Sequence, residues 1–268
     1  MDFAFIGNND LVSAEADARF AAEHGFRGLE YNYWGGGLAA ETADTMKQMR
    51  DIFDNHGVCC SALGLWGMNH LSPDAAERAT AHESLSLAIE YAQILGAKVL
   101  ITGGGQIPDA GISEQAAEFI KVFPPFLDRM EAAGLTPSFY AVHGASFFTT
   151  IEAYEAVWET LPQVGIKYDP ANWRHAGQDY LDVVQRHGDK VSYVHIKEHL
   201  YRDGELVSQP AAGMGDIEFG KVMAFLYEHN YRGFLSMEPH GPIWGTPAND
   251  MRAKMLLLSK KYMGNFVL

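Results

Sequence analysis

Three short apolar stretches in the C-terminal half of the chain end in charged side chains. GIKYDP ends near Asp169, VSYVHIKEH carries His195 and Lys197, and FLSMEPH ends with Glu238 and His240. Alternate side chains of a β-strand share a face, so His195 and Lys197 point the same way. Two carboxylates and an imidazole suit a divalent metal with open positions. We predict that Asp169, His195 and Glu238 bind a metal, with Mn²⁺ expected and Mg²⁺, Co²⁺ or Zn²⁺ as alternatives.

The same residues also allow a network of ion pairs without a metal. Asp169 could pair with Lys197, and Glu238 could pair with His195 or His240. Such pairs would make a satisfied polar layer. The sequence alone leaves both interpretations open.

Further polar and aromatic residues lie at or beyond the ends of apolar stretches. Lys197 could bind an anionic group such as a carboxylate or a phosphate. Glu30 could bind a sugar hydroxyl, whereas histidines at such positions either orient ligands or make structural hydrogen bonds. Tryptophan rings could pack against the C–H faces of a sugar, although rings also cap barrels. The expected substrate-binding residues are Glu30, Trp66, His143, Trp173, His240 and Trp244.

These residues must be positioned by an alternation of short β-like stretches and longer amphipathic ones. Glycines lie between the stretches. Ser72 and Pro73 are expected to begin a long helix, and Pro124 is expected to break a later one. Residues 202–206 are expected to form a hairpin. Eight strand–helix units predict a single (β/α)8 TIM barrel over residues 1–268, with a doubly wound sheet as the competitor. The expected strands cover residues 2–6, 28–33, 58–65, 98–102, 138–143, 165–169, 191–199 and 233–238.

Composition limits the possible partners and compartments. A chain of 268 residues with 47% hydrophobic residues can bury a large core, and its net charge of −14 argues against nucleic-acid binding. Cys59 and Cys60 are adjacent and are not expected to form a disulfide. Neither a leader nor a membrane segment is expected from the sequence, which predicts a cytoplasmic protein with no membrane partner.

The chain also resembles a known family. GIKYDPANW, VSYVHIKEH, AAGMGDIEFGKV, RGFLSMEPHG and AIEYAQILGAKVLITGGG are similar to stretches of the xylose-isomerase-like TIM barrels, a superfamily of sugar and sugar-phosphate isomerases and epimerases. The resemblance implies that Asp169, His195 and Glu238 are metal ligands. It also implies a further glutamate in a Glu-x-His-Gly motif, where this chain has Ala141 in FYAVHG. Either the chain is a natural three-ligand variant, or a glutamate was replaced by Ala141.

The resemblance implies a reaction as well. Family members use two glutamates to exchange protons on either side of a ketose carbonyl, so Glu238 would act as ligand and base, with Lys197 steadying charge. We expect a divalent-metal-dependent isomerase or epimerase of a small ketose or keto-sugar, impaired in epimerisation by Ala141. A lyase on the same scaffold (dehydratase, decarboxylase or keto-glycoside-cleaving enzyme) and a non-catalytic sugar-binding subunit stay open. A homodimer or homotetramer is expected.

Overall fold

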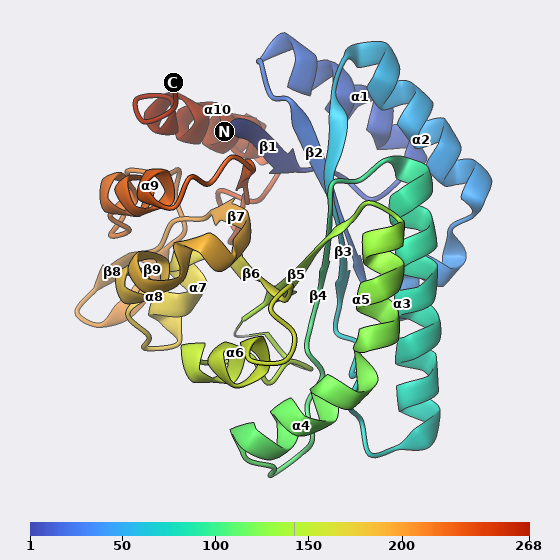
Figure 1. Cartoon of the computed structure of the whole chain (residues 1–268). Helices are drawn as coiled ribbons and strands as arrows, with labels where there is room; N and C mark the ends of the chain where they lie inside the picture. The colour runs from blue at the N-terminus through green and yellow to red at the C-terminus, as the bar shows by residue number, and fades with distance from the viewer. Residues whose placement is uncertain (142) are drawn as a thin grey trace.

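Parallel strands pair side by side until the last meets the first (Figure 1). The computed structural model describes residues 1–141 and 143–268, and within them eight strands close into a barrel in the order β1-β10-β7-β6-β5-β4-β3-β2. The predicted TIM barrel is therefore confirmed. The barrel strands are β1 (Asp2–Ile6), β2 (Gly28–Trp34), β3 (Cys59–Trp66), β4 (Val99–Thr102), β5 (Thr136–Tyr140), β6 (Gly165–Tyr168), β7 (Val191–Ile196) and β10 (Phe234–Met237).

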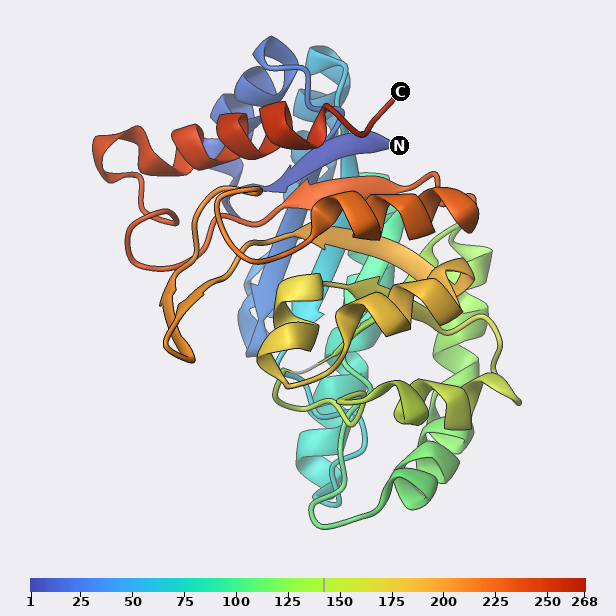
Figure 2. The same cartoon turned by 90° about the vertical axis from the view of Figure 1, so that its left-hand side faces the viewer.

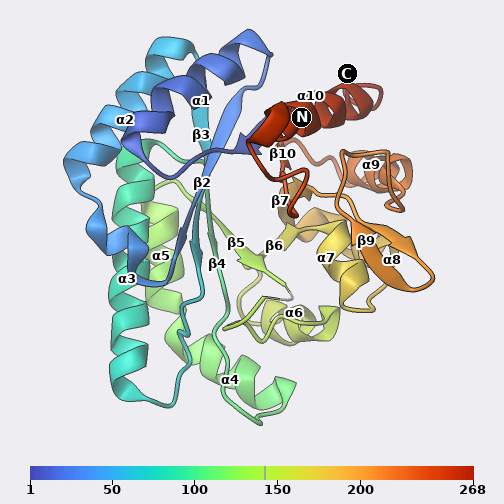
Figure 3. The ribbon, with the colours of Figure 1, turned by 180° about the vertical axis from the view of Figure 1, so that it is seen from behind.

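Helices surround the barrel, and α2, α3 and α5 pack side by side outside its first strands (Figure 3). The α-helices are α1 (Leu11–Glu23), α2 (Ala43–His56), α3 (Ala75–Leu95), α4 (Ile112–Val122), α5 (Pro124–Ala132), α6 (Ile151–Trp158), α7 (Pro170–His175), α8 (Tyr180–His187), α9 (Phe219–Glu228) and α10 (Met251–Met263). Short 3-10 segments are η1 (Gly35–Ala40), η2 (Gly188–Lys190) and η3 (Ala248–Asp250).

Side chains alternate between the inside of the barrel and the layer under the helices. On β5, Phe139 packs outward against Phe119 and Phe123, whereas Tyr140 packs inside the barrel with Trp66. The pairing of Tyr140 with Lys167 on β6 carries the same inward direction to the neighbouring strand. The inward face of each strand end therefore determines which side chains can meet at the top of the barrel.

Local signals define most helix ends as expected, with one correction. Gly57 and Gly96 end α2 and α3 in the left-handed conformation that glycine adopts without strain. The expectation that Ser72 and Pro73 begin α3 is wrong. Asp74 is the N-cap, because its carboxylate accepts hydrogen bonds from the backbone amides of Ala76 and Glu77.

Two departures from the simple repeat were expected. Pro124 divides the fourth predicted helix into α4 and α5, since proline suits the first turn of a new helix. A two-stranded antiparallel hairpin, β8 (Leu200–Arg202) with β9 (Glu205–Ser208), follows β7. Figure 2 shows this hairpin on the side to which the barrel strands point, so it flanks the end of the barrel where this fold carries its active sites.

The two termini lie close together in all three views of the ribbon (Figures 1, 2 and 3). α10 lies beside the N-terminal strand, where its residues complete the layer of helices. None of the helices in the described part of the chain is both long enough and apolar enough to span a membrane.

Candidate active site

The strand ends bring together the residues that the sequence singled out as metal ligands. Asp169 directly follows β6, His195 lies on β7 and Glu238 directly follows β10. One ligand atom from each lies within 4.8 Å of the others, and among the described residues this is the one such group of His, Cys, Asp and Glu. Val194, Ile196 and Met237 face the outer layer, so alternation directs their charged neighbours into the barrel.

His195 lies between carboxylates on both sides of its ring. Its Nδ1 is 2.7 Å from Glu238 Oε2 and 4.0 Å from Asp169 Oδ2. Its Nε2 is 2.9 Å from both carboxylate oxygens of Glu30. Glu30 is fully buried and also accepts a hydrogen bond of 2.6 Å from the Ser236 hydroxyl. Glu30 therefore fixes the imidazole from behind.

Two buried lysines complete the cluster. Lys167 Nζ is 3.2 Å from Asp169 Oδ2, and Lys197 Nζ is 3.1 Å from Glu238 Oε1. The side chains of Lys167 and Lys197 are only 1% and 4% exposed, so water does not screen these pairs strongly. The ion-pair interpretation is thus correct in part: Glu238 pairs with His195, but Lys197 pairs with Glu238 and leaves Asp169 to Lys167.

Neighbouring charges in the cluster keep its carboxylates and its histidine in their charged forms, although burial favours the neutral forms. Burial favours the neutral acids, but the ammonium groups of Lys167 and Lys197 outweigh it and hold the pKa of Asp169 below its ordinary value. Burial likewise opposes charge on Glu238, yet Lys197 and His195 hold its pKa well below the usual range. For His195, burial lowers the pKa, but the Glu30 and Glu238 carboxylates outweigh it and raise the pKa overall. Without a metal, the site is a network of mutually stabilised ions.

The same donor set fits a divalent metal. Carboxylate oxygens and an imidazole nitrogen are the ligands that Mn²⁺ and Zn²⁺ accept in proteins. When His195 donates its Nε2–H to Glu30, its Nδ1 lone pair faces Asp169 and Glu238, which is the carboxylate–histidine arrangement found behind many metal ligands. Asp169 Oδ1 accepts the amide of Asn172 at the start of α7, which fixes the orientation of that carboxylate.

A pocket opens directly above the cluster. Trp66 stacks on Tyr140 with ring centroids 4.3 Å apart, and Trp34 stacks on the other side of Trp66 at 5.6 Å. Trp34 is 63% exposed, so an aromatic surface leads from the solvent into the pocket. The pocket is lined by Ile6, Asn9, Asn32, Trp34, Trp66, His143, His195, Glu238, Pro239 and His240.

Most of the chain matches one known protein family. Residues 18–261 match the family described as Xylose isomerase-like TIM barrel. The chain belongs to this family. The match covers nearly the whole chain, and the eight-stranded barrel of the structure agrees with the family's fold.

Three solved structures share the fold at low sequence identity. The D-allulose 3-epimerase from Methylomonas sp. in complex with D-allulose superposes with a TM-score of 0.80 at 17% identity, covering 100% of this chain and 97% of the other. An L-ribulose 3-epimerase gives 0.78 at 18% identity, covering 99% and 94%. The IolI protein with a bound zinc atom gives 0.76 at 16%, covering 100% and 98%.

A curated relative matches by sequence over a shorter stretch. The inosose dehydratase of Geobacillus kaustophilus (strain HTA426) is 27% identical over 115 residues. The match spans 37% of this chain and 37% of the relative. The relative that matches by sequence is thus named a dehydratase, and two of the solved structures are named sugar 3-epimerases.

The structure brings only some of the expected substrate-binding residues to the pocket. Trp66, His143 and His240 line it, whereas Glu30 lies behind His195. Trp173 is fully buried in the outer layer near Tyr154, and Trp244 packs against the same layer. Trp173 and Trp244 are therefore not among the residues that line this pocket.

Ala141 also lies differently from the sequence-based expectation. It follows β5 and packs with the outer layer, while the preceding Tyr140 faces the barrel interior. Burial and the nearby Lys167 lower the pKa of His143 to about 4, and Asn172 lies 3.0 Å from its Nε2. The role of position 141 as that of the family's second glutamate stays a prediction.

Sequence reasoning missed two supporting residues. Asn32 accepts a hydrogen bond of 2.8 Å from the Trp66 indole and donates one to Glu30, which links the pocket wall to the cluster. Glu198 holds the turn after the hairpin by accepting amides from His199 and Ile217. The period-two pattern of GLEYNY placed Asn32 on the same face as Glu30, so its inward direction could have been found.

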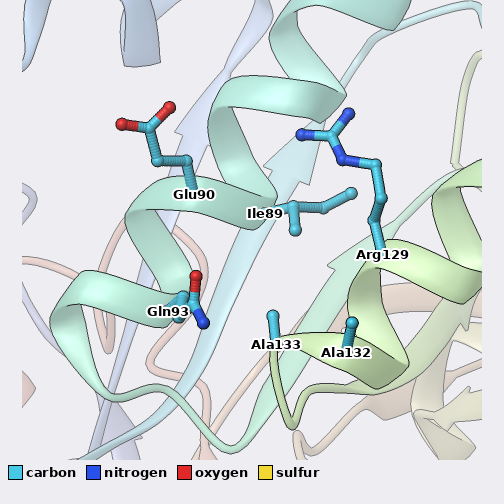
Figure 4. A pocket seen from close by; sticks show the side chains of 6 residues that line it. All are labelled: Ile89, Glu90, Gln93, Arg129, Ala132 and Ala133. Carbon is cyan, nitrogen blue, oxygen red and sulfur yellow. The ribbon is translucent and has the colours of Figure 1, made fainter.

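A second hollow, between α3 and α5 on the outside of the barrel, lacks comparable chemistry. Figure 4 shows its few polar side chains, Glu90, Gln93 and Arg129, lying apart around Ile89 and two alanines. Glu90 and Arg129 are the charged side chains that line this hollow, and both lie on helix surfaces. The pocket above His195 is thus the better candidate for catalysis.

Proposed function

We propose that the chain is a divalent-metal-dependent isomerase of a small ketose or keto-sugar. The observation that carries the proposal is the placement of His195: Glu30 holds Nε2, and Nδ1 faces Asp169 and Glu238 at the floor of an aromatic-lined pocket. Asp169, His195 and Glu238 would hold the metal. When bound, the metal would polarise the substrate carbonyl and make the neighbouring C–H proton easier to remove.

Glu238 would remove that proton. Its side chain is 13% exposed, more than that of any other carboxylate in the cluster, and it lines the pocket. Lys197 pairs with Glu238 Oε1. Its ammonium group would steady the negative charge as the enediolate forms. Glu238 would then return the proton to the adjacent carbon on the same face, and the proton of the neighbouring hydroxyl group would pass to the former carbonyl oxygen. Trp66 would pack against the sugar, with His143 and His240 orienting its hydroxyl groups.

A lyase is the second candidate, and one observation favours it over an epimerase. Among the described residues that line the pocket, Glu238 is the one carboxylate. Epimerisation needs an acid and a base on opposite faces of the carbon, whereas isomerisation and elimination can proceed with one base. A dehydratase, decarboxylase or keto-glycoside-cleaving enzyme thus stays compatible with the site.

Solvent isotope exchange tests the isomerase and the lyase together, because both reactions begin by removing the proton next to the carbonyl. Manganese-loaded protein is incubated with a ketose panel in D₂O, and ¹H NMR follows loss of the proton next to the carbonyl. We expect exchange with at least one ketose, with isomer or elimination product identifying the reaction. Glu238→Gln should abolish the exchange, and Glu90→Gln, on the outer face of α3, should not. No exchange on any ketose by metal-loaded protein would contradict the proposal.

Several sequence-based predictions stay predictions. They are manganese as the native metal, the cytoplasmic location and the homodimer or homotetramer. A sugar-binding subunit without catalysis is the outcome to infer if a ketose binds but no proton exchanges.

A further inference from the structure

The buried cluster contains five charged side chains, and their net charge bears on the charge of the substrate. Three carboxylates, Glu30, Asp169 and Glu238, lie with two ammonium groups, Lys167 and Lys197. Each of these five side chains is at least 87% buried by its exposed fraction. Net charge in such a place is costly because little water is available to solvate it.

A divalent ion changes the sign of this cluster. His195 is neutral when Nδ1 binds a metal and Nε2–H is donated to Glu30. The three carboxylates and two ammonium groups then carry one negative charge together, and a divalent ion turns this into one positive charge. Removal of a substrate proton by Glu238 would only move charge within the site. A neutral ketose therefore leaves the metal-loaded site with an uncompensated positive charge throughout.

Among the described residues, the pocket walls supply no further anion. Apart from Glu238, the lining consists of apolar, aromatic, amide and imidazole side chains. The Asn172 side-chain amide donates to His143 Nε2 at 3.0 Å, so this ring nitrogen carries no proton. His240 Nδ1 lies 3.0 Å from the uncharged amide oxygen of Gln209. Glu198 is oriented away, since its carboxylate accepts the backbone amides of Gly213 and Ile217.

We propose that the metal-loaded site selects a substrate with one negative charge, namely a keto-sugar acid. The inference rests on the proposed metal-dependent function and deepens it. Lys167 lies 5.4 Å from the centre of the Trp66 ring, so its charge borders the pocket wall. A carboxylate balances one positive charge, whereas a phosphate ester, with almost two negative charges, would exceed it.

The test compares two ligands that differ at one carbon. D-Fructose and 2-keto-D-gluconate share a six-carbon skeleton, with a hydroxymethyl group in the first and a carboxylate in the second. Each is titrated by calorimetry into Mn²⁺-loaded wild-type protein, and a titration into Mn²⁺ alone corrects for chelation. We expect the acid to bind at least about tenfold more tightly. Equal binding, or tighter binding of fructose, would overturn the inference.

Variants assign the preference to the cluster. Lys167→Met should reduce the preference to below about threefold, because the site then loses its surplus positive charge. Lys190→Met is the matched control: Lys190 lies 5.5 Å from the centre of the Trp158 ring but at the opposite end of the barrel, at the start of β7. A preference retained in Lys167→Met would also overturn the inference.

The outcomes separate this inference from the proposed function. If wild-type protein binds Mn²⁺ but shows no preference for the acid, the inference fails and the metal-dependent function stands. If wild-type protein binds no Mn²⁺, both fail. Should Lys167→Met not fold, the comparison of the two ligands on wild-type protein still decides.

Discussion

Side chains at the ends of three strands build the candidate site. Asp169, His195 and Glu238 each follow or end an apolar run, and the fold does bring them together. The contact of Glu30 with His195 could not be predicted, because 165 residues separate them and only barrel closure brings β2 and β7 into reach. The pairing of Lys167 with Asp169 was available from strand alternation, which places both on one face.

Position 141 shows the limit of a residue-level prediction. The motif FYAVHG suggested that Ala141 shares the face of the site, but β5 ends at Tyr140, which is the residue that points inward. Both residues are apolar or aromatic, so the pattern could not determine the face. Tyr140 also hydrogen-bonds to the Gly67 amide, which fixes its ring inside the barrel.

We expect Ala141→Glu to leave Mn²⁺ affinity within about threefold of wild type, since a side chain in the outer layer cannot reach the cluster. Calorimetric titration with Mn²⁺ measures the effect. Affinity that rises tenfold or more would instead place position 141 in the ligand set, as the family resemblance implies.

At the scale of elements, the strand–helix repeat was predictable and the short elements were not. α7 was missed, although Asp169 and Pro170 form a recognisable helix start, with the carboxylate accepting the Asn172 amide. The segment looked like a loop because six residues are too few to show a helical period. One side chain thus serves as helix cap and as candidate ligand.

Glu198 fixes the turn between the hairpin and α9. Its carboxylate accepts amide hydrogen bonds from His199, Gly213 and Ile217, and a Cβ at Gly215 would lie 2.6 Å from Glu198 Oε1, so glycine is required there. Burial raises the pKa of Glu198 in spite of these bonds. The turn is therefore built around one carboxylate.

Glu198→Ala should lower the free energy of unfolding by at least about 2 kcal/mol, because several amides lose their acceptor. Urea denaturation measures it, with Glu205→Ala on the exposed strand β9 as the control. An effect as small as that of Glu205→Ala would mean that the turn is held by other contacts.

At the scale of the whole molecule, acid should destabilise the barrel through a buried histidine. His70 is fully buried, and its Nε2 lies 3.0 Å from Thr102 Oγ1 at the end of β4. Burial lowers its pKa to about 3 from an ordinary value of 6.5. The unfolded chain therefore binds a proton that the native barrel does not, and stability falls as pH drops below about 6.5 towards 3.

From pH 7 to pH 5, His70 should account for about 2 kcal/mol of lost stability. Urea denaturation at both pH values should show a smaller loss in His70→Gln than in wild type. His24→Gln, at the exposed end of α1, should behave as wild type. If His70→Gln loses as much stability as wild type, another group is responsible for the acid sensitivity.

The most direct test of the central claim is the stoichiometry and affinity of metal binding. Metal-free protein is titrated with Mn²⁺ by calorimetry, together with His195→Ala, Glu30→Gln and the control Glu90→Gln. Wild type and Glu90→Gln should bind one Mn²⁺ per chain, His195→Ala should lose binding, and Glu30→Gln should weaken it by about 10- to 100-fold. Absence of Mn²⁺ binding by wild type, or equal affinity in His195→Ala, would contradict the account.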